Sequence, residues 1–252
     1  MKYSLSVLAA VLLLSGCDST PQLTSDDLIV NAIANPDRSD ADRERDARSH
    51  PEVILDLLDI NTGDVVADVL GGGGYYTELI AGVVGPDGEA ILQNNTPYAT
   101  FVKQQLQERY IDTTVPGIRV LFSEVDDLQL EPGSLDAVLM VMSFHDLYYY
   151  NPERGWLNTD VPLFLAQLYA ALKPEARLVI VDHAALPDTG KSAVEATHRI
   201  DEVFVQQEFE DAGFSLVASS DALRNPDDDK TKLVFDKSVR GHTDRFVLAF
   251  KK

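Results

Sequence analysis

Short apolar runs recur along most of the chain, and turn residues bound each of them. The first run, at 65–69, is typical of a parallel strand that is buried on both faces of a sheet. We expect further strands at 89–92, 118–122, 135–141 and 177–181, with two more at 214–218 and 245–250. Patterns with helical periodicity separate the runs, so the hydrophobic pattern predicts an α/β domain.

The clearest helical pattern follows the first of these strands. Tyr76, Leu79, Ile80 and Val83 recur at i, i+3, i+4 and i+7, which places them on one face of a helix. Apolar residues also predict a helix over 97–110.

Residues that can cap a helix indicate where further helices begin. Asp160 precedes a helix that stops at Lys173, and Thr197 can cap a helix that closes at Gly213. Ser49 and Glu52 have the spacing of a capping box.

A glycine-rich corner lies between the first strand and its helix. The strand carries Asp68, four glycines follow at 71–74, and the helix starts near Tyr76. Glycines let the backbone turn sharply and approach a ligand, and the helix N-terminus presents free N–H groups. The spacing does not match Gly-x-Gly-x-x-Gly, and the lysine of a phosphate-binding P-loop is missing. The corner therefore predicts a nucleotide-type ligand of another class, against the alternative of a plain strand-to-helix turn.

The first 17 residues have the features of a targeting segment. Lys2 precedes an apolar stretch at 5–14 that is short for a membrane span. The stretch ends in Leu14-Ser15-Gly16-Cys17, which resembles a bacterial lipobox, and Cys17 is the only cysteine. We expect a signal peptide at 1–17, lipid attached to Cys17 and a polar tether at 18–24. The protein would then be anchored in the bacterial cell envelope and face the periplasm; the alternative is a secreted protein with an incidental cysteine.

The net charge of the chain limits the classes of partner that it can bind. The net charge is −20 and the isoelectric point is about 4.4, so the chain repels nucleic-acid phosphates and we expect no nucleic-acid partner. Residues 25–60 are charged and helical, and we interpret them as a helical cover over the first strand. Three adjacent acids at 227–229 indicate a solvated turn, and no His/Cys spacing indicates a metal site.

Several motifs together resemble the class I S-adenosylmethionine (SAM)-dependent methyltransferases. The glycine corner resembles their motif I, with Asp68, Gly72 and Gly74 in register and Leu70 in place of the first glycine. The run Gly133-Ser134-Leu135-Asp136 resembles the segment before their fourth strand. Leu172-Lys173-Pro174 resembles the late signature Leu-Lys-Pro, and Tyr-Tyr-Thr-Glu after the glycines is similar to a bacterial subgroup of predicted methyltransferases.

This resemblance covers about residues 50–252 and implies the fold and the cofactor. It implies a Rossmann-like domain at 61–252, with a seven-stranded mixed sheet, helices on both faces and an antiparallel last strand between strands five and six. The cofactor would be SAM. Amides after strand two would meet its ribose hydroxyls, and an acid after strand three would lie near its adenine. The implied cofactor-binding residues are Asp68, Gly71, Gly72, Gly73, Gly74, Tyr76, Gln93, Asn94, Glu124, Met142 and Ser143.

The candidate catalytic residues are His145, Asp146 and His183, at the ends of strands four and five. Ligands of open α/β sheets bind at these carboxyl ends. His145 would take a proton from the methyl acceptor, with Asp146 orienting its ring, and His183 is the second candidate base. The function expected is methyl transfer to a small-molecule acceptor. The alternative is a non-catalytic exported protein that binds a nucleoside or a SAM-related ligand, because a lipobox would place the chain outside the cytosol where SAM is made.

Overall fold

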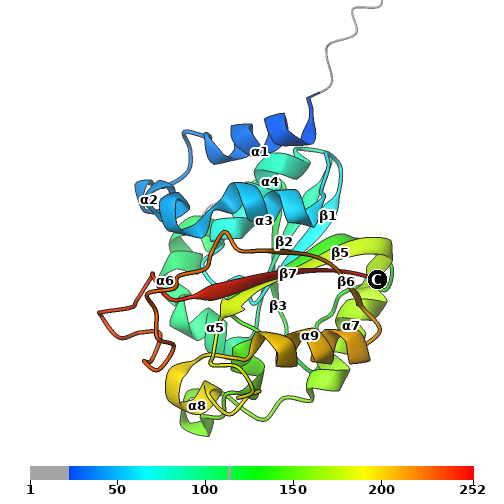
Figure 1. The fold of residues 1–252 in the computed structure, drawn as a ribbon. Coiled ribbons are helices and arrows are strands. Elements are labelled where there is room, and N and C mark those ends of the chain that lie inside the picture. Colours follow the sequence, from blue (N-terminus) through cyan, green and yellow to red (C-terminus); the bar gives the residue numbers. More distant parts are fainter. Residues whose placement is uncertain (1–22, 113–114) are drawn as a thin grey trace, which may run out of the picture.

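The computed structural model describes residues 23–112 and 115–252. One seven-stranded sheet forms the centre, in the order β3-β2-β1-β4-β5-β7-β6 (Figure 1). The strands are β1 (Val65–Val69), β2 (Glu89–Asn94), β3 (Ile118–Phe122), β4 (Leu135–Val141), β5 (Leu172–His183), β6 (Ser215–Ser220) and β7 (Arg245–Lys251). β7 runs antiparallel between β5 and β6, and the other neighbours are parallel. The predicted mixed sheet, including the placement of the last strand, is confirmed.

Helices cover both faces of the sheet (Figure 1). Adjacent residues of β4 point to opposite faces, so Val138 and Met140 join one core cluster while Ala137 and Leu139 join the other. α7 (Val161–Ala171) and α9 (Glu202–Asp211) pack on the first face, and α4 (Tyr75–Val84) and α3 (Pro51–Leu58) pack on the second. This double coverage explains why the central strands are continuously apolar.

The N-terminal helices lie over α4. α1 (Ser25–Ile33) packs closely on it, since a Cβ added at Gly82 would lie 2.8 Å from the Cβ of Ala32. α2 (Asp40–Ser49) is held by Arg109, whose Nη2 lies 2.7 Å from an Asp42 carboxylate oxygen and 2.6 Å from one of Glu78. These ion pairs fix α2 beside the carboxyl end of β1.

Three local predictions were wrong. Ser49 is the last residue of α2, and α3 begins after His50, which is left-handed and makes no capping side-chain bond. The helix expected over 97–110 is divided into α5 (Thr96–Phe101), α6 (Lys103–Leu106) and a π-helix, η1 (Gln107–Ile111). Thr197 ends α8 (Val194–Thr197), and Asp201 caps α9 by accepting a bond from the backbone N–H of Val203.

Within the described residues, no helix combines the length and the apolar character needed to cross a membrane.

Candidate active site

A cavity of about 720 Å³ opens where β1, β4 and β5 end. Gly71, Gly72 and Gly73 after β1, Met142 after β4 and His183 at the end of β5 line it. The parallel strands bring these segments to one edge of the sheet, where ligands of open α/β sheets bind.

The glycine corner is built around a buried carboxylate. Asp68 accepts a bond from the Thr77 hydroxyl at 2.6 Å, and burial raises the pKa of Asp68 to about 6. A Cβ at Gly71 would lie 2.5 Å from this carboxylate, so a side chain cannot fit there. Asp68 does not line the cavity; it ties α4 to β1 and holds the loop in shape.

The amides at the end of β2 hold the loop rather than face the cavity. Gln93 accepts from the Leu70 N–H at 3.1 Å and donates to the Ser123 carbonyl at 2.9 Å. Asn94 accepts from the Gly72 N–H and donates to the Gly72 carbonyl oxygen, both at 2.9 Å. The strand continues through both residues, which places their side chains against the loop. The side-chain oxygen and nitrogen of each amide are thus already engaged within the protein. Neither amide has a free polar atom for the ribose hydroxyls that it was expected to hold.

Four other expected cofactor residues lie outside the cavity lining. Glu124 accepts bonds from the backbone N–H and the hydroxyl of Thr96. The Tyr76 hydroxyl donates to the carbonyl oxygen of Ser49 at 3.2 Å. Gly74 lies under the hydroxyl of Tyr110, and Ser143 is fully buried. Of the expected set, the cavity is lined by Gly71, Gly72, Gly73 and Met142.

His145 lies on the cavity wall at the start of a 3₁₀ turn, η2 (His145–Tyr148). Its Nδ1 lies 2.7 Å from Asp182 Oδ1, and its backbone N–H donates to Asp182 Oδ2 at 2.9 Å. Asp146 lies on the other side of the ring, with Oδ1 3.3 Å from Nε2. The residue that orients the ring through Nδ1 is therefore Asp182, not Asp146 as the sequence suggested.

The two carboxylates decide the charge of this ring. Burial alone lowers the pKa of His145, but Asp146 and Asp182 outweigh it and raise the pKa to about 9. His183 differs, since burial and the nearby charge of His145 lower its pKa well below the usual value. Its Nδ1 lies 2.7 Å from the Thr243 hydroxyl. At pH 7 the cavity thus holds a protonated His145 beside a neutral His183.

His198 completes the cluster and was missed by sequence reasoning. Its Nδ1 lies 3.2 Å from Asp146 Oδ1, and its ring centroid lies 4.5 Å from that of Tyr149. His145, Asp146 and His198 offer atoms within 4.8 Å of one another and could hold a metal ion. His198 is 52 residues from Asp146, so no motif spacing pointed to this group. The sequence prediction of no metal site stays a prediction.

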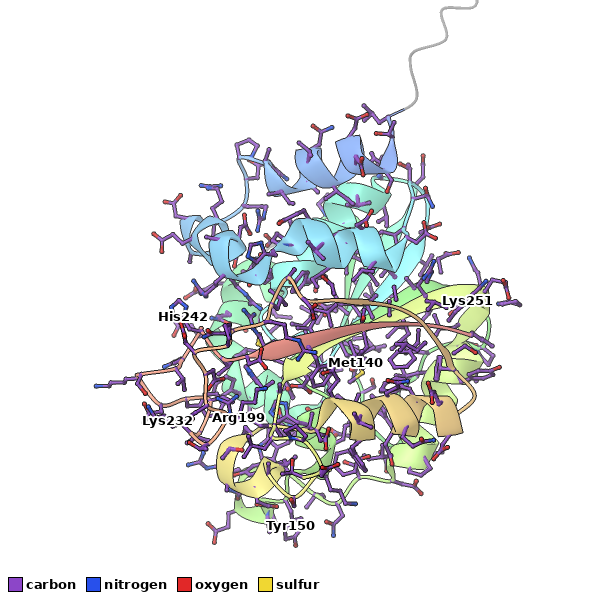
Figure 2. All side chains as sticks on the ribbon, viewed as in Figure 1. Met140, Tyr150, Arg199, Lys232, His242 and Lys251 are labelled. Carbon is purple, nitrogen blue, oxygen red and sulfur yellow. The ribbon has the colours of Figure 1, made fainter. Side chains whose placement is uncertain are left out.

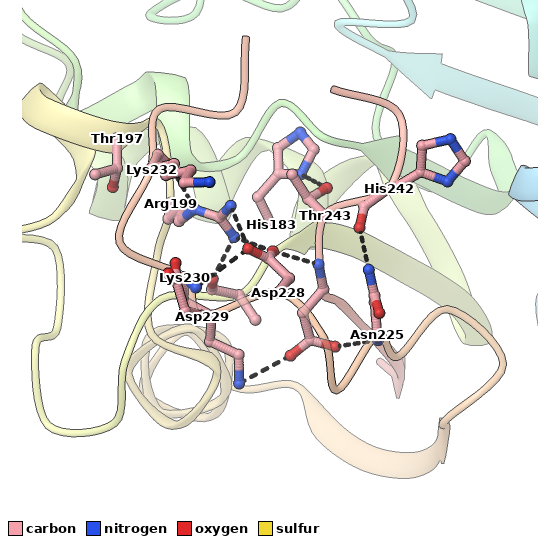
Figure 3. Close-up of polar contacts among 12 residues, drawn as sticks. His183, Thr197, Arg199, Asn225, Asp228, Asp229, Lys230, Lys232, His242 and Thr243 are labelled. Atoms are coloured by element: carbon pink, nitrogen blue, oxygen red, sulfur yellow. Dashed lines mark hydrogen bonds and ion pairs between the residues drawn. The ribbon is translucent and has the colours of Figure 1, made fainter. Parts of the chain in front are cut away.

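The segment 221–244 closes one side of the cavity. Arg199 and Asp228 are fully buried side chains joined by two bonds, at 2.8 and 3.1 Å. Asp228 also accepts from the Asp244 N–H at 2.7 Å, and Lys230 lies 2.9 Å from Asp244 (Figure 3). Arg199 and His242 lie at the same end of the molecule (Figure 2). This network holds the residues of the segment that line the cavity: Val234, Phe235, Arg240, Gly241, His242 and Thr243.

No protein-family model matches the chain. It is 26% identical over 151 residues to the 6-hydroxytryprostatin B O-methyltransferase of Aspergillus fumigatus, covering 58% of this chain and 41% of that protein. It is 24% identical over 133 residues to the ubiquinone/menaquinone biosynthesis C-methyltransferase UbiE of Saccharophagus degradans, covering 52% and 47%. The chain thus spans less than half the length of these curated relatives.

Solved structures share the whole fold. The crystal structure of a SAM-dependent methyltransferase from Aquifex aeolicus superposes with a TM-score of 0.56 at 19% identity, covering 91% of this chain and 99% of that one. The strand order, the glycine corner after β1 and these similarities agree with one another. The protein has the class I SAM-dependent methyltransferase fold and resembles enzymes of that class in sequence.

Proposed function

We propose that the protein transfers a methyl group from SAM to a small-molecule acceptor. One observation carries the proposal: the glycine corner and His145, whose ring is held by the buried Asp182, line the same cavity. A donor at the corner and a proton acceptor beside it are what methyl transfer needs, because such an enzyme chiefly aligns two reactants. The methyltransferase relatives support the same chemistry.

The glycines of the corner suit SAM. Gly72 faces open space, since a Cβ there would have only Val102 as a neighbour, at 4.0 Å. The backbone at Gly71, Gly72 and Gly73, with Met142 in the same lining, would hold the donor at close range. Bound SAM supplies an electrophilic methyl group on its sulfonium.

In this proposal the residues of the cluster have separate roles. In its neutral form, which gains population as the pH approaches 9, His145 takes the acceptor proton at Nε2, and Asp182 positions the ring through Nδ1. Asp146 stabilises the imidazolium that results. Asp146 is itself held by the hydroxyl of Tyr98, which donates to Oδ2 at 2.7 Å, and by His198.

Calorimetry with SAM, with its demethylated product and with free nucleosides tests the proposal. Saturable binding of SAM, followed by methyl transfer to small molecules screened with labelled SAM, supports it. Binding of nucleosides without binding of SAM would make the protein a ligand-binding descendant of the fold.

The substitution Gly72→Val is expected to abolish SAM binding while the fold is kept. Gly72 has φ +61 and lines the cavity, so a β-branched side chain would fill the donor site and add strain of about 1 to 3 kcal/mol. Calorimetry measures the binding and circular dichroism the fold. Gly133→Val is the matched control, because Gly133 has φ +63, open space around it and no place in the cavity lining. Normal SAM binding by Gly72→Val would show that the corner is only a turn.

We further propose that the chain is a lipoprotein of the bacterial cell envelope. Cys17 lies outside the residues that the structure describes, and the proposal rests on the lipobox. The substitution Cys17→Ala is expected to abolish the incorporation of labelled fatty acid and to release the protein from the membrane fraction. Equal label in the variant and the parent would contradict lipid attachment at Cys17.

A further inference from the structure

The arginines of the described residues form two groups. Those outside the cavity each lie within 3.8 Å of a carboxylate: Arg38, Arg43, Arg109, Arg119, Arg177, Arg199 and Arg224. Those that line the cavity have no such ion pair within the part of the chain that is described: Arg45, Arg48, Arg154, Arg240 and Arg245. Guanidinium groups stay protonated in proteins, so among the described residues the arginine charge that lacks a carboxylate partner lies in this one cavity.

The cavity thereby reverses the charge balance of the chain. The sequence has 41 acidic and 21 basic residues, yet among residues 23–112 and 115–252 Asp146 is the only one that brings a carboxylate to the lining. Both of its oxygens already have partners, Tyr98 on one and His145 and His198 on the other. A concave site lined by one sign of charge concentrates ligands of the opposite sign.

Arg245 is the member of this group whose burial most requires a ligand. It is only 8% exposed, and its buried Nε has no hydrogen-bond partner. Its Nη2 donates to the Arg48 carbonyl oxygen at 2.6 Å. Burial lowers the pKa of its guanidinium. Arg38, whose Nε also lacks a partner, and Arg199 are 3% and 0% exposed, but each binds a carboxylate through its two terminal nitrogens. A buried guanidinium without an anion is costly.

Two distant segments bring the charges together. Arg45 and Arg48 belong to α2, while Arg240 and Arg245 lie at the end of the segment 221–244 and the start of β7. The bond from Arg245 to Arg48 joins these segments, and a Cβ at Gly241 would lie 3.6 Å from the Arg48 side chain. We call these four arginines the arginine wall.

We infer that the arginine wall binds an anionic group, a carboxylate or a phosphate, of the methyl acceptor. Guanidinium groups match these planar or tetrahedral anions through paired hydrogen bonds. Tyr98, Tyr149 and Trp156 line the same cavity and offer apolar surface for the rest of the molecule. The inference rests on the proposed methyl transfer, because it takes the anion to be part of the acceptor. The carboxylate of SAM is the other anionic group that the wall could bind.

Trp156 provides a direct measurement. It is the only tryptophan of the chain and lines the cavity, so its fluorescence reports occupancy without any turnover. Benzoate, its neutral counterpart benzamide and inorganic phosphate are titrated separately. We expect benzoate to bind at least about tenfold more tightly than benzamide, and phosphate to compete with benzoate. Added salt should weaken the binding of both anions. Equal affinity for benzoate and benzamide, or no saturable binding of either anion, overturns the inference.

Substitutions test whether benzoate binding depends on the arginine wall. Arg245→Met is expected to weaken benzoate binding by about 10- to 100-fold. Arg240→Gln, at an exposed position where the fold is not at risk, should weaken it in the same direction. Arg119→Gln is the control, because Arg119 pairs with Glu89 and does not line the cavity. Benzoate binding that is unchanged in both cavity variants overturns the inference.

Calorimetry with SAM on the same proteins separates the two sources of the anion. SAM affinity that is unchanged in the cavity variants supports an anionic acceptor. Variants that lose SAM affinity and keep benzoate affinity would assign the wall to the donor carboxylate and overturn the inference. If the parent protein binds benzoate but not SAM, the proposed methyl transfer is refuted and the anion can no longer be part of a methyl acceptor. The anion-binding site itself would still be supported.

Discussion

The substitution His145→Ala is expected to lower methyl transfer by about 10²- to 10⁴-fold, the usual loss when a general base is removed. His145 faces the cavity and is positioned by Asp182, while the glycine corner that would hold SAM is built from other residues. SAM affinity should therefore stay close to that of the parent. Turnover with labelled SAM and calorimetry measure the two quantities separately.

The pH profile gives this prediction a second readout. The pKa of His145 is raised to about 9, so the ring is protonated at pH 7 and becomes a base only as the pH approaches 9. Turnover of the parent should rise with pH over this range, and the rise should disappear in His145→Ala. Asp182→Asn should give a smaller loss, because it disturbs the orientation of the ring. Equal rates in the parent and His145→Ala would eliminate His145 as the base and move attention to His183.

The second large effect concerns the buried pair of Arg199 and Asp228. Removing one partner leaves an uncompensated charge in the interior, so Arg199→Met is expected to lower the free energy of unfolding by about 3 to 5 kcal/mol. That is a large part of the stability of an ordinary domain. Urea unfolding measures it. Because the pair also holds the segment 221–244, ligand binding in the cavity should weaken at urea concentrations below the unfolding transition.

Two further variants show whether burial is the cause. Arg224→Met breaks a partly exposed pair with Glu202 and should cost about 1 kcal/mol or less. The double variant Arg199→Met, Asp228→Leu removes both buried charges and should recover part of the lost stability. A cost for Arg199→Met no larger than that of Arg224→Met would mean that the segment is held by its backbone contacts instead.

The sequence by itself determined the sheet and the position of the glycine corner. Strands at 118–122 and 135–141 were predicted with the bounds that the structure has, because an apolar run between turn residues marks a strand both at the centre of the sheet, where β4 lies, and at its edge, where β3 lies. Helix α4 was equally clear from its periodicity. These features depend on residues within a few positions of one another, which a linear pattern records.

Only the tertiary structure decided which side chains meet in the cavity. Asp182 took the orienting position expected for Asp146, His198 joined from a residue far along the chain, and the amide of Asn94 turned inward to the glycine loop. That the buried Arg245 guanidinium has no carboxylate partner follows only from the tertiary structure, which shows the partner of each arginine. Periodicity reports which face of an element is buried. Hydrogen bonds and ion pairs between distant segments depend on how those faces are packed, and no local pattern in the sequence carries that information.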